Sequence, residues 1–177
     1  RILMESEGIN LESNGVSVMS LDGVNNIKYP YHLLDQLEIP CFYILDKDYF
    51  LPYRNGSKKK IRDDSGFPQY KYSYKDDRLI EEIVPSVDDR DKLLEAFGAN
   101  HTKALDILEE HNVVCMRRNL EADLFVSKKA KEIFADVIDI DGVPSVQDLL
   151  VDRSQQIKHE PYLVATVDRL PNKNLPR

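Results

Sequence analysis

An apolar run that ends in two carboxylates constrains the fold of this chain more than any other feature. Five residues, Cys41 to Leu45, run directly into Asp46-Lys47-Asp48. A continuous apolar run of this length is typical of a strand buried on both faces of a parallel sheet. Open α/β folds place their sites at the carboxyl ends of such strands. The run therefore predicts a parallel α/β fold with a site at Asp46 and Asp48.

The spacing of the two acids predicts a metal site. On an extended backbone, side chains two residues apart point to the same side. Asp46 and Asp48 would then share a divalent cation, which prefers hard oxygen ligands. A polar turn at the end of the strand is the alternative interpretation, because Asp is common in turns.

Length and composition bound the class of protein. The chain has 177 residues, 42% hydrophobic and 31% charged, as expected for a soluble globular domain with room for an insertion. It has no apolar run of transmembrane length and no signal-peptide pattern, and its start at Arg1 indicates a fragment. Cys41 and Cys115 lie in apolar runs and are predicted to be buried thiols in a reducing, cytoplasmic compartment. The four histidines show no ligand spacing.

The net charge of −7 argues against a surface that simply coats nucleic acid. It does not exclude an enzyme that acts on nucleic acid, since carboxylates clustered for a metal are negative before the cation binds. Basic patches remain, and each is either a solvated face or a phosphate contact: residues 58–62, 117–118 and 128–131.

Hydrophobic patterning predicts strands and helices in alternation, with a helical pair inserted between them. The predicted strands are Ile2–Met4, Val16–Leu21, the run ending at Asp46, and Val113–Met116. The predicted helices are residues 29–38, 88–97 (with Ser86 as a possible cap), 102–111, 127–134, 145–151 and 161–170. The order from Val16 to Asp46 predicts a βαβ unit. Residues 54–77 lack a stable period, which is typical of a functional or partly disordered loop.

A second acid pair, Glu121 and Asp123, follows the predicted strand at Val113 with the same spacing. If the two strands are neighbours in a parallel sheet, four carboxylates converge at their ends. Such a cluster is tolerable only with cations between the acids, which predicts a site for one or two metal ions. The alternative is that Glu121 and Asp123 open a helix, whose N-terminus favours acids.

Several segments resemble a known family, the Toprim domain. They are Gly8 to Gly23, the acid pair Asp46-Lys47-Asp48, and Leu120-Glu121-Ala122-Asp123-Leu124. The closest resemblance is to the C-terminal Toprim nuclease of OLD-family (overcoming lysogenization defect) ATP-dependent endonucleases, which include the nuclease subunit of the Gabija phage-defence system. The resemblance spans nearly the whole chain. It implies a mostly parallel Toprim-like sheet flanked by helices in two parts, residues 1–53 and 113–177, around a loop and helical insertion, 54–112.

The resemblance also implies an activity, the Mg²⁺- or Mn²⁺-dependent hydrolysis of phosphodiester bonds in DNA. The implied ligands of one or two ions are Asp46, Asp48, Glu121 and Asp123. Lys173 is the implied lysine at the scissile phosphate, where an ammonium stabilises developing charge. A solvent-exposed lysine in a C-terminal loop is the alternative for Lys173.

The chain departs from the family pattern at its start. The family's first strand runs into a Glu-Gly signature, a second acid and a full helix, whereas here Met4 passes directly to Glu5-Ser6-Glu7-Gly8. A crossover needs about a dozen residues, so we expect that a segment is missing between Met4 and Gly8. Glu7 is the formal match to the family's catalytic glutamate and a further candidate metal ligand.

The partners follow from the same resemblance. The chain contains no Gly-x-x-x-x-Gly-Lys-Ser/Thr, so the family's ATPase domain is expected upstream in the same protein. We expect no membrane association, and a homo-oligomer could form through the absent region. Two alternatives come from other classes of protein: a receiver-like Mg²⁺-binding phospho-acceptor domain, and a non-catalytic acidic interaction module.

Overall fold

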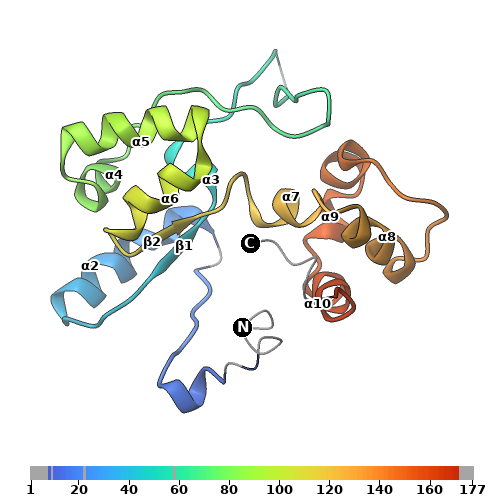
Figure 1. Ribbon diagram of the computed structural model, residues 1–177, viewed down its shortest axis with the longest axis horizontal. Coiled ribbons are helices and arrows are strands. Elements are labelled where there is room, and N and C mark those ends of the chain that lie inside the picture. The colour runs from blue at the N-terminus through green and yellow to red at the C-terminus, as the bar shows by residue number, and fades with distance from the viewer. Residues whose placement is uncertain (1–7, 9, 22, 58, 172–177) are drawn as a thin grey trace. The chain divides into compact units, whose positions relative to one another are not determined.

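The computed structural model describes residues 8, 10–21, 23–57 and 59–171, which form two compact units (Figure 1). We call residues 21–61 and 68–119 the sheet unit, and residues 1–20, 62–67 and 120–177 the helical unit. The predicted boundaries at residues 53 and 113 stay a prediction.

The sheet unit holds a parallel pair of strands, β1 (Tyr43–Leu45) and β2 (Val113–Cys115). Tyr43 lies opposite Val113 and Leu45 opposite Cys115. No further strand occurs among the residues that the structure describes. The chain between and before the strands forms η2 (Val24–Ile27), α2 (Lys28–Gln36), α3 (Lys47–Phe50), α4 (Arg78–Ile83), α5 (Val87–Ala99) and α6 (His101–Glu109). The predicted α/β class and parallel pairing are confirmed.

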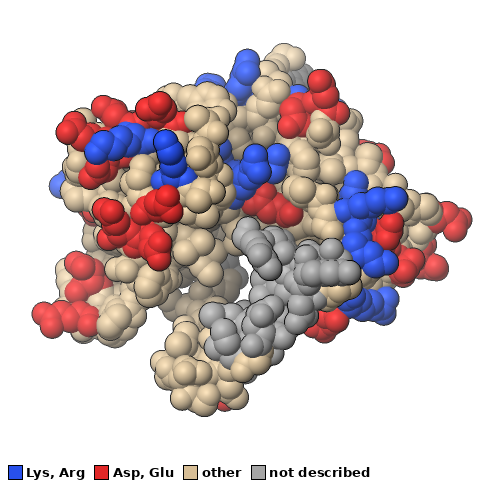
Figure 2. Space-filling view, in the orientation of Figure 1, with Lys and Arg blue, Asp and Glu red and all other residues tan. Residues whose placement is uncertain are grey.

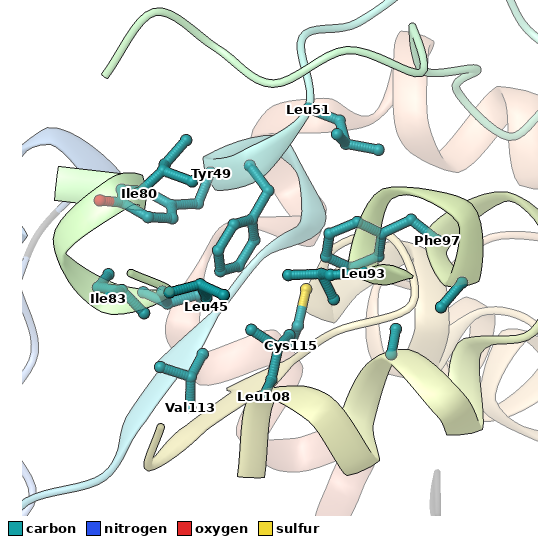
Figure 3. Close-up of a cluster of buried hydrophobic side chains, with 14 of the residues drawn as sticks. Leu45, Tyr49, Leu51, Ile80, Ile83, Leu93, Phe97, Leu108, Val113 and Cys115 are labelled. Carbon is teal, nitrogen blue, oxygen red and sulfur yellow. The ribbon is translucent and has the colours of Figure 1, made fainter. Parts of the chain in front are cut away.

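One face of this sheet carries the core of the unit. Leu45, Val113 and Cys115 are buried and point to the same side, because side chains alternate along a strand. Helices α5 and α6 cover that side and contribute Leu93, Phe97 and Leu108, among others (Figure 3). This packing fixes the position at which β1 ends.

The prediction that β1 is buried on both faces is wrong. Ile44 is 68% exposed and its neighbour Val114 is 43% exposed, while Phe42, just before the strand, is also exposed. Helices α5 and α6 cover the opposite side, and in the described structure Ile44 and Val114 remain open to solvent. Cys41 is half-buried rather than buried, whereas Cys115 is buried as predicted, and neither forms a disulfide in the described structure.

The predicted strand at Val16–Leu21 is also wrong, and with it the βαβ unit built on that strand. No strand is assigned to these residues in the described structure, and Val16, Val18 and Met19 are exposed. Alternating patterning favours a strand only where a neighbouring strand supplies the hydrogen bonds. The predicted strand Ile2–Met4 lies outside the described residues.

The predicted helices of the sheet unit form close to their expected bounds. Side chains cap both inserted helices: Ser86 accepts a hydrogen bond from the Asp89 N–H at 3.2 Å, and Asn100 accepts one from Thr102 at 3.1 Å. Helix α4 is an addition that patterning did not predict, and its N-cap is Asp77.

The segment predicted as an irregular loop after residue 53 is partly ordered. Three stretches hydrogen-bond to one another: the Arg54 N–H donates to the Gln69 carbonyl, Gln69 N–H to Ile61, and Ile61 N–H to Arg54. Isolated antiparallel bridges join Tyr53 to Tyr70 and residue 55 to residue 60. We call residues 52–61 with 68–71 the basic hairpin, because its exposed part carries Arg54, Lys59 and Lys60 and no acid.

The helical unit contains η1 (Glu12–Asn14), α7 (Leu120–Leu124), α8 (Lys128–Val137), the π-helical turn η3 (Asp148–Asp152), α9 (Ser154–Ile157) and α10 (Glu160–Asp168). Phe125, Phe134 and Leu149 are fully buried in its core. Gly66, at φ +88°, lies so close to the backbone of Gln147 that an added Cβ would be 2.9 Å from the Gln147 nitrogen. Among the described residues, every helix is too short or too polar to cross a membrane.

Candidate functional site

The acid pair lies where the sequence predicts it, at the carboxyl end of β1. Asp46 follows the last strand residue in an extended conformation, and Asp48 lies in the first turn of α3. The Met116 N–H donates to the Leu45 carbonyl at 2.8 Å, and the Lys47 N–H donates to the Arg118 carbonyl at 2.8 Å. The turn that carries both acids is therefore held against the residues that leave β2.

One premise about the acid pair is wrong. The chain does not stay extended through Asp48, because α3 begins at Lys47. Asp46 and Asp48 therefore do not occupy equivalent positions on one strand face. Both side chains remain half-buried, so each is in contact with solvent.

Two tyrosines of the basic hairpin lie beside the acid pair. The rings of Tyr53 and Tyr70 stack with centroids 5.0 Å apart. Burial raises the pKa of the Tyr53 phenol, and the charge of Asp48 and a hydrogen bond to its carboxylate raise it further. Burial also raises the pKa of Tyr70, with smaller contributions from Asp48 and Asp46. Both acids thus act on the same pair of phenols, which stay protonated at neutral pH.

A basic side chain contacts this cluster. The Lys60 ammonium lies 3.5 Å from the centroid of the Tyr53 ring, a cation–π contact. Arg117 and Arg118 follow β2 after Met116. Acidic and basic side chains are intermixed over the face seen in Figure 2, as expected for a surface that does not coat nucleic acid by charge alone.

Lys47, between the two acids, is buried and only 8% exposed. Its ammonium donates a hydrogen bond of 2.7 Å to the backbone carbonyl of Phe97 in α5. The nitrogen also lies 5.3 Å from the ring centroids of both Tyr70 and Phe97. Sequence reasoning missed Lys47 and Tyr53, because a lysine between two aspartates has the pattern of an exposed turn.

Glu121 and Asp123 lie on α7 in the helical unit, so the alternative that they open a helix is confirmed. Both are in the first turn of α7, where the helix dipole favours acids. That the two pairs share cations stays a prediction, and Glu7 and Lys173 lie outside the described residues.

The acid pair of β1 has the oxygen-donor chemistry that a magnesium ion prefers. Mg²⁺ keeps several waters and is commonly bound through one or two carboxylates together with substrate phosphates. Asp46 and Asp48 supply two such carboxylates, both accessible to water. Within the described ranges, no group of three or more His, Cys, Asp or Glu side chains is arranged to hold a metal ion. The fit therefore rests on the two aspartates.

Comparison with known proteins bears on the segment that ends at this site. Residues 1–48 match the family model described as the overcoming lysogenization defect protein-like TOPRIM domain. Over these residues the chain is similar to an OLD-like Toprim domain. The matched segment ends at Asp48, so it includes both acids of the pair. No curated protein and no solved structure matched the chain.

The family resemblance drawn from the sequence is thereby confirmed for residues 1–48. The match to an OLD-like Toprim domain suggests a nuclease-type domain, and Toprim domains generally bind Mg²⁺. The match covers 48 of the 177 residues and includes neither the basic hairpin nor Glu121 and Asp123.

Proposed function

We propose that this OLD-like Toprim domain is a metal-dependent DNA endonuclease in which Asp46 and Asp48 bind Mg²⁺ or Mn²⁺. The observation that carries the proposal is the position of the acid pair. Both residues end the family-matched segment and leave β1 beside the exit of β2. Open parallel sheets place their sites at this edge.

The chemistry divides between the ion and the chain. A bound divalent cation supplies Lewis acidity and an activated water for attack on phosphorus. Asp46 and Asp48 hold and orient the ion, and their exposure leaves room for a phosphate oxygen. The Tyr53 phenol orients the Asp48 carboxylate. Lys59 and Lys60 supply positive charge for the neighbouring phosphates of the strand.

The remaining members of the site are proposed from the family pattern. Glu121 and Asp123 would complete a second cation position, Glu7 would stand for the first-strand glutamate, and Lys173 would stabilise the scissile phosphate. The same proposal includes coupling to an ATPase domain elsewhere in the protein and the formation of a homo-oligomer. It also includes a cytoplasmic location and a role in phage defence.

Plasmid cleavage tests the proposal. Supercoiled DNA is incubated with the chain and Mg²⁺ or Mn²⁺, and nicked and linear products are separated on a gel. We expect wild-type cleavage that EDTA abolishes. The variants Asp46→Asn and Asp48→Asn, which keep side-chain size but lose the anionic ligand, should fall to background.

Asp106→Asn is the matched control, because Asp106 is an exposed acid on α6 of the same unit. It should cleave as the wild type does. Cleavage that persists unchanged in both Asp46→Asn and Asp48→Asn contradicts the proposal. Two further measurements separate the alternatives. Calorimetry should show no uptake of Mg²⁺ or Mn²⁺ by an interaction module. Incubation with a small phosphodonor should give an aspartyl phosphate if the domain is receiver-like.

A further inference from the structure

Lys47 is the one charged side chain that is buried among the residues the structure describes. It stands between the two acids of the candidate site, yet its side chain runs away from solvent into the core of the sheet unit. There the ammonium lies between the rings of Phe97 and Tyr70, 5.3 Å from each centroid. Phe97 belongs to α5 and Tyr70 to the basic hairpin, so one side chain joins three segments.

The acceptor of Lys47 is a carbonyl at the end of a helix. Helix α5 ends at Ala99, and its last backbone bond runs from the Asn100 N–H to the Ala96 carbonyl at 2.8 Å. The carbonyl of Phe97, one residue further, is among the last four of the helix and lacks an intrahelical donor. The Lys47 ammonium donates to it at 2.7 Å. The last turn of α5 has no basic residue of its own, so Lys47 also supplies the positive charge that a helix C-terminus favours.

We propose that Lys47 is the positioning residue of the Asp46/Asp48 pair, a role that rests on the proposed function. Its side chain is fixed by the Phe97 carbonyl and its backbone N–H by the Arg118 carbonyl. Residue 47 is therefore held at both ends, which holds the backbone from which the two neighbouring carboxylates extend. Groups that orient metal ligands in this way affect metal affinity although they do not touch the metal.

Burial of a lysine does not by itself increase the stability of a fold. Removing an ammonium from water is costly, and an apolar side chain of similar shape commonly fits such a position as well or better. An unbranched apolar residue such as Met would also fill the space between Tyr70 and Phe97. The lysine adds a positive charge and a hydrogen bond to the Phe97 carbonyl, and their effect is to fix the turn that carries the two acids.

The test compares Mn²⁺ binding by the full chain and by Lys47→Met, using calorimetry at a temperature at which circular dichroism shows both to be folded. Lys47→Met keeps the unbranched stem and loses the charge and the donor. We expect a Mn²⁺ dissociation constant raised about 10–100-fold with unchanged stoichiometry. DNA cleavage by the variant should be recovered at raised Mn²⁺ concentration, because the ligands remain present.

Lys92→Met is the matched control, since Lys92 is an exposed lysine on α5 that pairs with Asp89 at 3.1 Å. It should bind Mn²⁺ as the wild type does. If Lys47→Met yields too little folded protein, Lys47→Arg carries the test, because it keeps the cation and the donor. A folded Lys47→Arg chain should hold Mn²⁺ within about threefold of wild type, and a clear drop in affinity in that variant contradicts the role.

Two negative outcomes are distinguishable. A wild type that takes up no Mn²⁺ contradicts the proposed function, and the role of Lys47 with it. A wild type that binds Mn²⁺ while folded Lys47→Met binds it equally well contradicts only the positioning role, and a lowered melting temperature alone would then mark Lys47 as structural.

Discussion

The Lys60 ammonium lies 3.5 Å from the centroid of the Tyr53 ring. The hydroxyl group of Tyr53 in turn donates a hydrogen bond to the carboxylate of Asp48. This contact links the exposed part of the basic hairpin to the candidate metal site within one unit. Between Asp48 and Asp63 the sequence contains no acid, while Arg54, Lys59 and Lys60 are exposed. A nucleic-acid strand with one phosphate at the acid pair would therefore meet positive charge alongside it.

Removal of this charge should weaken DNA binding in a salt-dependent manner. Each phosphate of duplex DNA that the protein no longer neutralises lowers the slope of log K against log salt by about 0.9. We expect Lys59→Ala and Lys60→Ala each to reduce the slope by up to that amount. The measurement is fluorescence anisotropy with a labelled duplex over a salt series, in Ca²⁺ so that the duplex is not cut. Lys92→Ala is the control, and slopes equal to wild type in both hairpin variants would contradict the binding of DNA by the hairpin.

Helix α5 should depend strongly on its buried face. Leu93 is fully buried between the sheet and the inserted helices (Figure 3). We expect Leu93→Ala to lower the free energy of unfolding by about 2–5 kcal/mol, because apolar burial is reduced and a cavity is left behind. Leu37→Ala, at an exposed position just after α2, should change it by less than about 0.5 kcal/mol. Urea denaturation followed by circular dichroism measures both, and equal effects would contradict the assigned core.

The N-cap of α5 makes a separate and smaller contribution to the stability of the fold. The Ser86 hydroxyl accepts a hydrogen bond from the Asp89 N–H at 3.2 Å. Ser86→Ala should cost about 1 kcal/mol of stability, whereas Ser86→Asp, another good cap, should cost much less. The exposed Ser73→Ala serves as the matched control in thermal melts. A Ser86→Ala chain as stable as Ser73→Ala would show that the cap contributes nothing.

An ion pair between α2 and α4 predicts a pH dependence. Burial alone would raise the pKa of Asp77, but hydrogen bonds from the Lys28 ammonium, at 3.0 Å, and the Leu79 N–H outweigh it and lower the pKa below 3.8. A carboxylate with a lowered folded-state pKa adds stability that is present above its unfolded pKa and lost as pH falls through the folded value.

The wild type should therefore be more stable than Asp77→Asn at pH 6, and this difference should shrink as the pH falls below 3.8. Asn keeps the N-cap of α4, so the comparison isolates the charge. Thermal melts over a pH series measure the difference. A difference independent of pH, or one unaffected by Lys28→Met, would contradict the ion pair.

Local sequence patterns were enough to predict many of the helices and strands of the sheet unit. Hydrophobic patterning over residues 29–38 predicted α2, and Ser86 located the start of α5 because capping is a local interaction. The apolar run ending at Asp46 located the candidate site, because the end of a strand and the acids that follow it can both be recognised in the sequence. The strand at Val113 was also predicted correctly.

Long-range partners decided the features that sequence reasoning missed. Lys47 is buried because its acceptor lies fifty residues further along the chain, at the end of α5. Ile44 is exposed although its run is apolar, because helices cover only one face of the described sheet. Glu121 and Asp123 repeat the spacing of Asp46 and Asp48, but they follow an irregular stretch after β2 and lie on a helix. Identical spacing on different backbones has different consequences.

Anomalous scattering from crystals soaked in Mn²⁺ tests the central claim most directly, because the ion positions identify the ligands. The account predicts a Mn²⁺ peak about 2.1 Å from carboxylate oxygens of Asp46 and Asp48 at the carboxyl end of β1. A protein that binds Mn²⁺ only at other residues, or shows no peak at this strand end, would contradict it.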